Sequence, residues 1–585
     1  MKHYYYNEYF DLGQQQIVNF NLYQIGIPED DSVHTLKKIL KELNFDKLLA
    51  RYSNKGRKGY NPIMMYALIV YANMRGIRSV DKIVDLCKRD ICFMWLAKGE
   101  KPERDAFYDF MNKKATEHIM ENLHYQFINI LKKEGYISLE SLFVDGTKIE
   151  ANANRYTFIW RGSINYHLSN LLASIEELFN RYNNLLITNG YNEKYNLYEE
   201  EMFVIEGMDK VKEIIKKNKE RKLNKKKKIS NNKIIKINNM CPLKLLKLQE
   251  NLAKISREEN IVFVQGRGNK KTELQKIYEL IEESGKRLLR YKESFEIMGE
   301  DRNSYSKTDV EATFMRMKDD HMRNGQLKPA YNVQIAVENY FIIHTYVSSD
   351  RTDYNTLIPI IEKHKKMTGV NLLEVTADSG YCSEKNLKYL KDNKIKSYIK
   401  LQEHEKKKTR KYYEQIGKHY NMEKIETLDS NGNKQIYYKC YDNRKLEFVR
   451  EETSIIKDFT RNYKVYVCKD CSGCSHKLEC LYKYDEEKDI QKNKMMKINE
   501  DWEELKKESE KNVLSKKGIK NRQIRSIQTE GHFGDIKEND GLRRFNHRSK
   551  DKNYKEMMFN IMGRNLNKYH RFIQGTLKEF EPRTA

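Results

Sequence analysis

The sequence predicts a mixed α/β fold with a helical N-terminal region and two insertions. Apolar residues recur at helical spacing through residues 34–130, and short apolar runs end at Asp145 and at Asp378. Residues 329–350 contain two β-rich runs that are separated by a short turn. Helices and strands alternate after this point, which indicates a sheet that is covered by helices. The 585 residues exceed what one ordinary core can hold, so we expect several domains.

The N-terminal region is predicted to consist of helices. The segment HTLKKILKELNFDKLLARY has its leucines and isoleucine close to helical spacing. Two further helices are predicted over 61–74 and 79–90 around the turn RGIR, and Ser79 is a suitable cap for the second. A pair of helices with a Gly-containing turn is typical of a helix-turn-helix that contacts DNA, and equally of a plain helical bundle. Both interpretations stay open.

A strand follows over 141–144 and is predicted to end at Asp145. Residues 164–300 are mostly helical in pattern and very polar, and they include the lysine run VKEIIKKNKERKLNKKKKISNNKIIK. Such a run is a solvated helical face, a disordered loop or a non-specific contact with phosphates. Because no Pro-rich or Gly/Ser-rich linker separates this part from its neighbours, we interpret it as an insertion inside a fold.

The second half of the chain returns to α/β sequence. The two runs of 329–350 form a predicted hairpin with its turn at Glu338–Asn339. A helix over 353–369, a strand ending at Asp378, a helix over 383–393 with Ser383 as its cap, and a strand over 396–400 follow. Residues 402–520 form a second insertion with β-like pieces. Residues 521–575 are helical, with an apolar stripe that we assign to core packing: Tyr554, Met558, Ile561, Met562, Leu566 and Tyr569.

Composition limits the compartment and the partner. Lys and Arg total 109 against 84 Asp and Glu, which leaves a formal charge of +25. This excess favours a polyanion such as nucleic acid, although a lysine-rich host proteome would also produce part of it. The start MKHYYYNEYF is not a signal peptide, and the longest apolar run, 63–74, is too short and polar to span a membrane. We therefore expect a soluble cytoplasmic protein without a membrane partner.

Three acidic residues are the candidate catalytic groups: Asp145, Asp378 and Glu530. Two carboxylates at strand ends and one on a helix suit two Mg²⁺ ions, or Mn²⁺, held about 3.5–4 Å apart. The substrate of such a site on a basic chain is a phosphodiester. An Asp in a turn is often only structural, so the prediction depends on all three together.

The helix around Glu530 has features of a ligand site. Glu530 and Lys537 are two helical turns apart and share a face. Gly531 and Gly534 weaken a helix, and close approach of the backbone to a ligand would explain them. The alternative is an ordinary surface charge ladder. The residues predicted to contact DNA are Lys148, Arg155, Arg316, Lys318, Arg323, Lys328, Arg525, Lys537, Arg543, Arg544 and Arg548.

A cysteine cluster lies in the second insertion. Cys468, Cys471, Cys474 and Cys480 have the pattern C-x2-C-x2-C-x5-C, and His476 is a spare ligand. Four thiolates could bind a structural Zn²⁺ in a small segment that has little core of its own. The spacing is tight compared with common zinc ribbons, so free thiols are the open alternative.

Four segments together resemble the DDE transposases of bacterial insertion sequences: VDGTKIEANANRYTFIW, ATFMRMKDDHMRNGQLKPAYNVQIAV, TADSGYCSEKN and EGHFGDIKEN. The resemblance implies an RNase H-like catalytic domain and a Mg²⁺-dependent triad of Asp145, Asp378 and Glu530. Members of the related group carry Tyr-x2-Arg-x3-Glu-x6-Lys. Lys537 fits this signature, whereas Arg525 is one position too far from Glu530 and the Tyr is missing.

The resemblance also implies a function and partners. The protein would bind the terminal inverted repeats of an element, cleave its ends and join them to target DNA, acting as a homodimer or higher oligomer on DNA and associating with the nucleoid. Two alternatives are a DNA nuclease without strand transfer and an inactive DNA-binding regulator. The intact triad argues against the regulator.

The domains that follow from this interpretation are a helical N-terminal DNA-binding domain (1–135), the first part of an RNase H-like catalytic domain (136–401) with the lysine-rich insertion (164–300), an insertion with the cysteine cluster (402–520), and a C-terminal catalytic helix with a tail (521–585).

Overall fold

The computed structural model describes residues 26–53, 58–198, 205–223, 229–237, 240–266, 268–317, 326–428, 434–456, 459–481, 484 and 491–577. A mixed sheet stands at the centre, with strand order β10-β9-β1-β7-β6 and β8 also paired to β7. Strands β10, β9 and β1 are parallel to one another, whereas β7 runs antiparallel to β1, β6 and β8. The predicted mixed α/β architecture with a helical N-terminal region is confirmed.

The strands of this sheet are β1 (Ser141–Glu150), β6 (Thr313–Arg316), β7 (Leu327–Glu338), β8 (Phe341–Ser348), β9 (Glu374–Ala377) and β10 (Lys396–Ile399). The predicted hairpin is present, since β7 and β8 pair through a tight turn at Asn339–Tyr340 in which both residues have positive φ. Two positive φ angles are characteristic of a type I′ hairpin turn. The helices that accompany this part of the sheet are α12 (Leu357–Thr368) and α13 (Glu384–Asp392), the latter capped by Ser383 as predicted.

The N-terminal region is helical, as predicted. Its helices are α1 (Ser32–Glu42), α2 (Asp46–Leu49), α3 (Pro62–Met74), α4 (Val80–Arg89), α5 (Ile91–Ala97), α6 (Arg104–Asp109) and α7 (Glu117–Lys133). Ser79 caps α4 by accepting a hydrogen bond from the Lys82 amide. Helix α3 is buried on nearly all sides, so it is a core helix whose side chains face other protein elements.

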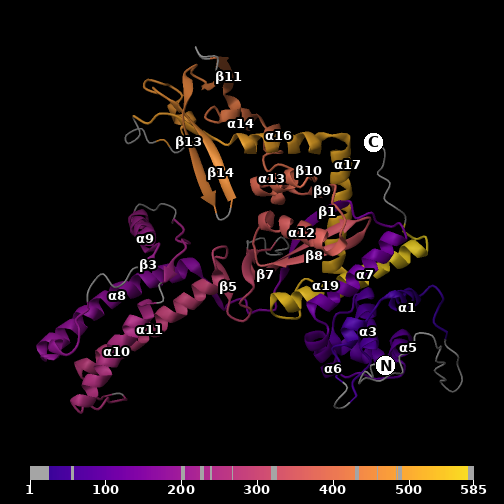
Figure 1. Cartoon of the computed structure of the whole chain (residues 1–585), viewed down its shortest axis with the longest axis horizontal. Helices are drawn as coiled ribbons and strands as arrows, with labels where there is room; N and C mark the ends of the chain where they lie inside the picture. The colour runs from indigo at the N-terminus through magenta and orange to yellow at the C-terminus, as the bar shows by residue number, and fades with distance from the viewer. Residues whose placement is uncertain are drawn as a thin grey trace.

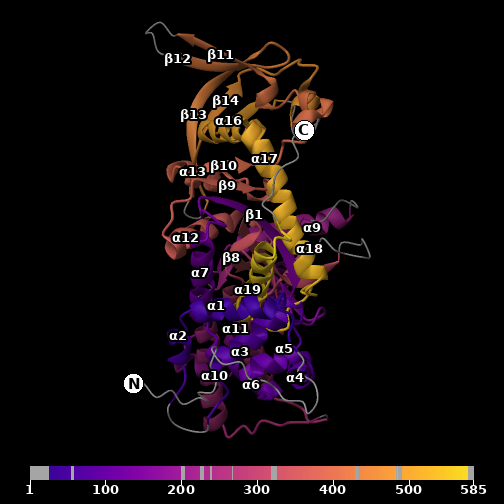
Figure 2. The same cartoon turned by 90° about the vertical axis from the view of Figure 1, so that its right-hand side faces the viewer.

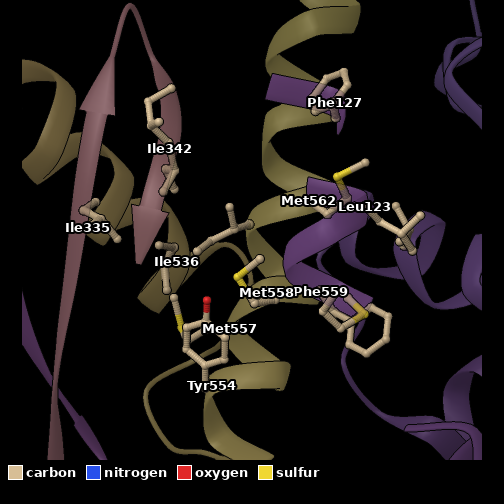
Figure 3. Packing of buried hydrophobic residues seen from close by; sticks show 14 of the residues in the cluster. Leu123, Phe127, Ile335, Ile342, Ile536, Tyr554, Met557, Met558, Phe559 and Met562 are labelled. Atoms are coloured by element: carbon tan, nitrogen blue, oxygen red, sulfur yellow. The ribbon is translucent and has the colours of Figure 1, made fainter. Parts of the chain in front are cut away.

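The C-terminal helices complete the same core. They are α16 (Glu500–Leu514), α17 (Lys516–Arg525), a π-helical turn (Ser526–Glu530), α18 (Gly531–Glu538) and α19 (Lys550–Ile573). The predicted apolar stripe of α19 is buried between α7 and the β7–β8 hairpin, as Figure 3 shows. A Cβ at Gly563 would lie 2.7 Å from the Met74 amide nitrogen, so only glycine lets α19 pack this closely against α3. One continuous apolar cluster therefore joins the N-terminal helices, the sheet and α19.

Two insertions lie apart from this central body (Figure 1). The first contains β2 (Phe158–Trp160), α8 (Arg161–Thr188), β3 (Ile205–Glu206), α9 (Met208–Leu223), β4 (Lys236–Ile237), α10 (Met240–Glu258), α11 (Glu273–Met298) and β5 (Ser304–Ser306). The second contains α14 (Arg410–Tyr413), β11 (Glu423–Leu428), β12 (Lys434–Lys439), β13 (Lys445–Ile456), β14 (Phe459–Cys468), α15 (Lys477–Cys480) and β15 (Met495–Ile498). Each insertion has its own apolar cluster, larger in the helical one. The exact domain boundaries stay a prediction.

A chain of buried polar groups fastens the helical region to the sheet. His364 Nε2 lies 3.0 Å from the Leu139 carbonyl oxygen, and this oxygen can only accept, so Nε2 carries the proton. His364 Nδ1 must then accept from His344 Nε2, 2.7 Å away, and His344 Nδ1 accepts from the Tyr125 hydroxyl at 2.6 Å. This relay holds both rings neutral. His124 nearby contacts the Ile343 carbonyl oxygen at 3.0 Å.

These histidines predict a specific loss of stability in acid. Burial lowers the pKa of His124 and His364 from 6.5 to about 4 and that of His344 well below 6.5. Each ring therefore takes up a proton on unfolding but not in the folded protein, and stability falls as the pH drops from 6.5 toward 4. The limiting slope is about 1.4 kcal/mol per pH unit for each histidine.

The substitution His344→Gln keeps one acceptor and one donor but does not titrate. We expect it to flatten the decline in the unfolding free energy between pH 6.5 and pH 5, as measured by denaturant titration. The matched control is His118→Gln at an exposed position of α7, which should leave the slope unchanged. A slope equal to that of the wild type in His344→Gln would contradict the assignment.

Candidate active site

Parallel pairing of two strands brings Asp145 and Asp378 together. Val144 in β1 is the register partner of Ala377, the last residue of β9, and the two aspartates are the next residues along the chain. The two carboxylates therefore leave neighbouring strands at the same level of the sheet. The expectation that the first strand ends at Asp145 is wrong, because β1 continues to Glu150 by antiparallel pairing with β7. Only the pairing of β1 with β9 ends at this point.

Both oxygens of Asp145 are engaged. Oδ1 accepts a hydrogen bond of 2.8 Å from the Gly146 amide. Oδ2 lies 2.7 Å from Arg525 Nη1 and 3.0 Å from the Thr529 hydroxyl. The side chains of Asp145 and Arg525 are only 11% and 15% exposed, so this ion pair is largely shielded from solvent.

Asp378 is held by the turn that follows its strand. Its Oδ1 accepts a hydrogen bond of 2.8 Å from the Gly380 amide. Burial raises the pKa of Asp378, and the negative charge of Asp145 raises this pKa further. Arg525 acts in the opposite direction. Negative charge therefore accumulates at this edge of the sheet, which a cation would relieve.

Glu530 reaches the same region from a helical segment that is not a regular α-helix. Helix α17 runs along β9 and β1 (Figure 2), and the π-helical turn Ser526–Glu530 follows it directly. Arg525 Nη2 lies 3.6 Å from Glu530 Oε1, whose side chain is 61% exposed. One arginine thus faces two of the three predicted catalytic carboxylates.

The donors fit a hard divalent cation in their chemistry, because Asp145 and Asp378 present carboxylate oxygens side by side. The carboxylate oxygens of the three predicted ligands do not converge on one point. Among the residues that the structure describes, no three His, Cys, Asp or Glu side chains lie close enough together to hold a metal ion. The guanidinium of Arg525 lies between Asp145 and Glu530.

Asp353 was not anticipated from the sequence. Its Oδ1 accepts hydrogen bonds from Asn332 Nδ2 at 2.7 Å and Gln334 Nε2 at 2.9 Å. A Cβ built on Gly380 would lie 3.0 Å from Asp353 Oδ2 and 2.9 Å from Asp378 Oδ1, so the two carboxylates flank this glycine. Asp353 follows a loop after β8 and no apolar run points to it, which is why sequence patterns missed it.

Gln334 connects the polar side chains beneath the carboxylates through hydrogen bonds. Its amide nitrogen donates to Asn332 Oδ1 at 2.9 Å and to Asp353, and its oxygen accepts from the Tyr381 hydroxyl. The side chain is fully buried, and a Cβ at Gly146 would meet its amide at 2.3 Å. Glycine at 146 is therefore required by the close approach of Gln334.

Four of the residues predicted to contact DNA lie around the end of β1, in two pairs. Arg155 and Lys328 both pair with the buried Glu150, at 2.9 and 3.4 Å. Arg544 and Arg548 donate to backbone carbonyl oxygens of Ala153 and Asn152. These four side chains brace the loop that follows β1, a structural task that their sequence pattern did not reveal.

The other basic residues differ in their positions. The Lys148 ammonium contacts the Arg316 carbonyl oxygen at 3.1 Å, and Arg316 itself is exposed at the end of β6. Arg543 pairs with Glu538, and Lys537 lies half-buried on α18. Lys318 and Arg323 lie outside the described residues.

The cysteine cluster is assembled at one end of the β11–β15 sheet. Cys468 and Cys471 are buried, Cys474 and Cys480 are partly buried, and Cys440 packs against the same small core. The Lys494 amide donates to Cys471 Sγ at 3.3 Å. The sequence pattern missed Cys440 because it lies directly after β12, 28 residues before the first cysteine of the cluster. The described thiols do not converge on one point, so zinc ligation stays a prediction.

Two protein-family models each match a part of the chain. The model of the transposase DDE domain matches residues 439–570, and that of the transposase domain (DUF772) matches residues 22–113. Both matches are to transposase domains. They confirm the resemblance to a DDE transposase of insertion sequences and support a transposase function. No curated protein and no solved structure matched the chain.

The matches cover Glu530 and the cysteine cluster, whereas Asp145 and Asp378 lie between the two matched ranges. The family implies DNA as the substrate and an enzyme that cuts and joins it. No helix among the described residues is long and apolar enough to cross a membrane.

The hydrogen-bond network of Gln334 leads to a prediction about the stability of the protein. Gln334→Leu would remove the hydrogen-bond partner of two buried groups, Asn332 Oδ1 and the Tyr381 hydroxyl, whereas Asp353 would keep its hydrogen bond from Asn332. Each buried polar group without a partner costs about 1–3 kcal/mol, so we expect a marked loss of unfolding free energy. Gln523→Leu at an exposed position of α17 is the control. Equal stability of the two variants by denaturant titration would show that the network is not needed.

Proposed function

We propose that the chain is an active transposase that binds the terminal inverted repeats of an insertion sequence, cleaves its ends and joins them to target DNA. The observation that carries this proposal is the register of β1 against β9, which sets Asp145 beside Asp378 while α17 and the π-helical turn bring Glu530 to the same edge. We infer that this sheet is the RNase H-like catalytic domain of the protein.

Asp145, Asp378 and Glu530 would hold two Mg²⁺ ions, or Mn²⁺. When bound, these ions would activate a water or a DNA 3′-hydroxyl for attack on phosphorus and stabilise the leaving oxygen. The protein residues fix the carboxylates: the Gly146 and Gly380 amides orient Asp145 and Asp378. Gln334 and Asn332 keep Asp353 next to Asp378 and thereby add negative charge to the site.

Joining an element to a target requires both of its ends at once, so we propose a homodimer or higher oligomer on DNA. A nuclease with the same carboxylates but without strand transfer is the second enzymatic candidate. The products separate the two, because only the transposase yields DNA in which an end is covalently joined to a target. An inactive regulator would bind DNA and make neither product.

The triad is tested with variants that keep the shape of each side chain. We expect Asp145→Asn, Asp378→Asn and Glu530→Gln to abolish cleavage of labelled duplexes carrying the element's ends in the presence of Mg²⁺. Binding of the same duplexes should persist, because phosphate contacts elsewhere supply most of the affinity. The control Asp392→Asn removes an exposed carboxylate from the end of α13 and should cleave normally. Cleavage at the wild-type rate by any triad variant would remove that residue from the site.

A substitution at Gly534 tests the hypothesis that DNA approaches the backbone of α18 at Gly531 and Gly534. No described protein atom outside the local helix lies within 4 Å of a Cβ placed at either position, so the protein itself leaves room for a side chain. Gly534→Ala should therefore raise the unfolding free energy by about 1 kcal/mol through helix propensity. We expect it nevertheless to weaken DNA binding, because the backbone of α18 would no longer be accessible.

The matched control is Gly285→Ala in α11, where a Cβ also meets open space. It should stabilise the protein without changing its affinity for the element's ends. If Gly534→Ala binds these ends as tightly as the control does, α18 does not form part of the DNA surface.

A further inference from the structure

Arg525 occupies the position where the predicted metal ligands meet. Its guanidinium lies 2.7 Å from Asp145 Oδ2 and 3.6 Å from Glu530 Oε1. With its side chain 15% exposed, this cation is part of the site and not a mobile surface group. The Thr529 hydroxyl lies 3.0 Å from the same Asp145 oxygen and 2.8 Å from the Arg525 carbonyl oxygen, which fixes the turn to the carboxylate.

The π-helical turn explains why Arg525 can face Glu530. Residues five apart on a regular α-helix point about 140° away from each other, so they do not share a face. A π-helical turn holds one residue more and stacks residues that are five apart. Ser526–Glu530 has this conformation. The extra residue between Arg525 and Glu530, which departs from the family's signature, is thus absorbed by the helix.

We propose that Arg525 is an internal counter-cation that competes with divalent metal ions for Asp145 and Glu530. A metal ligand must direct its lone pairs to the ion, and Asp145 Oδ2 directs them to Arg525 and Thr529. Two cations at such short range repel each other. With a metal ion on these carboxylates, Arg525 would turn away from Asp145, and its guanidinium would be available for a DNA phosphate.

The competition couples metal binding to DNA binding. A phosphate that holds Arg525 away from Asp145 makes the carboxylates better metal ligands, and by reciprocity the metal strengthens the contact with DNA. This inference rests on the proposed function, since it assumes that these carboxylates bind metal ions. It differs from a simple phosphate contact by Arg525, which would leave metal affinity in the absence of DNA unaffected.

The test is metal binding without DNA. Arg525→Met keeps an unbranched apolar stem but removes the charged guanidinium, and we expect it to bind Mn²⁺ roughly tenfold more tightly than the wild type by calorimetry, because a nearby like charge is lost. The control Arg522→Met removes an arginine one turn earlier on α17 and should bind Mn²⁺ as the wild type does. Arg525→Lys keeps the charge and should also stay close to the wild type.

The outcomes separate this inference from the proposed function. Equal Mn²⁺ affinity of Arg525→Met and the wild type, with Asp378→Asn reducing it in both, would reject the competition while retaining the metal site. Absence of Mn²⁺ binding in all proteins would reject the metal site and the competition together. If Arg525→Met does not fold, the neutral polar variant Arg525→Gln takes its place: tighter Mn²⁺ binding than the wild type without DNA would support the competition, and equal binding would reject it.

Discussion

Electrostatic repulsion between two neighbouring carboxylates is the constraint around which this molecule is arranged. The register of β1 and β9 sets Asp378 next to Asp145, and burial together with the charge of Asp145 raises the pKa of Asp378. The backbone amides of Gly146 and Gly380 and the guanidinium of Arg525 donate hydrogen bonds to these carboxylates and offset this electrostatic cost. The chemistry proposed for the site uses the same negative charge that the fold has to tolerate.

The rest of the fold serves to keep these groups in register. The ion pair of Lys517 with Glu374 joins helix α17 to the sheet, and the π-helical turn then places Glu530 near Arg525, which pairs with Asp145. One apolar cluster runs from the N-terminal helices through the sheet to α19, so the matched N-terminal and C-terminal transposase regions share a core. The insertions are attached to this body and carry separate clusters of their own.

Sequence patterns were sufficient where one residue type dictates one local structure. The hairpin, the Ser79 and Ser383 caps and the stripe of α19 follow from such rules and are present, although the hairpin turn lies at Asn339–Tyr340, one residue later than predicted. The predicted end of the first strand was wrong, because an apolar run shows where a strand is buried but does not show where its pairing with other strands ends. Asp353 and Cys440 were missed, since tertiary contacts alone bring them to their clusters. The sequence shows that Arg525 lies one residue further from Glu530 than the signature requires. It does not show that a π-helical turn compensates for this extra residue.

The most direct measurement is a crystal structure of the protein with Mn²⁺ and an end duplex, with the ions located by anomalous scattering. We expect Mn²⁺ bound by Asp145 and Asp378, and Arg525 displaced from Asp145 toward a phosphate. Mn²⁺ absent from these two carboxylates at saturating concentration, or bound there with the Arg525–Asp145 ion pair intact, would contradict this account.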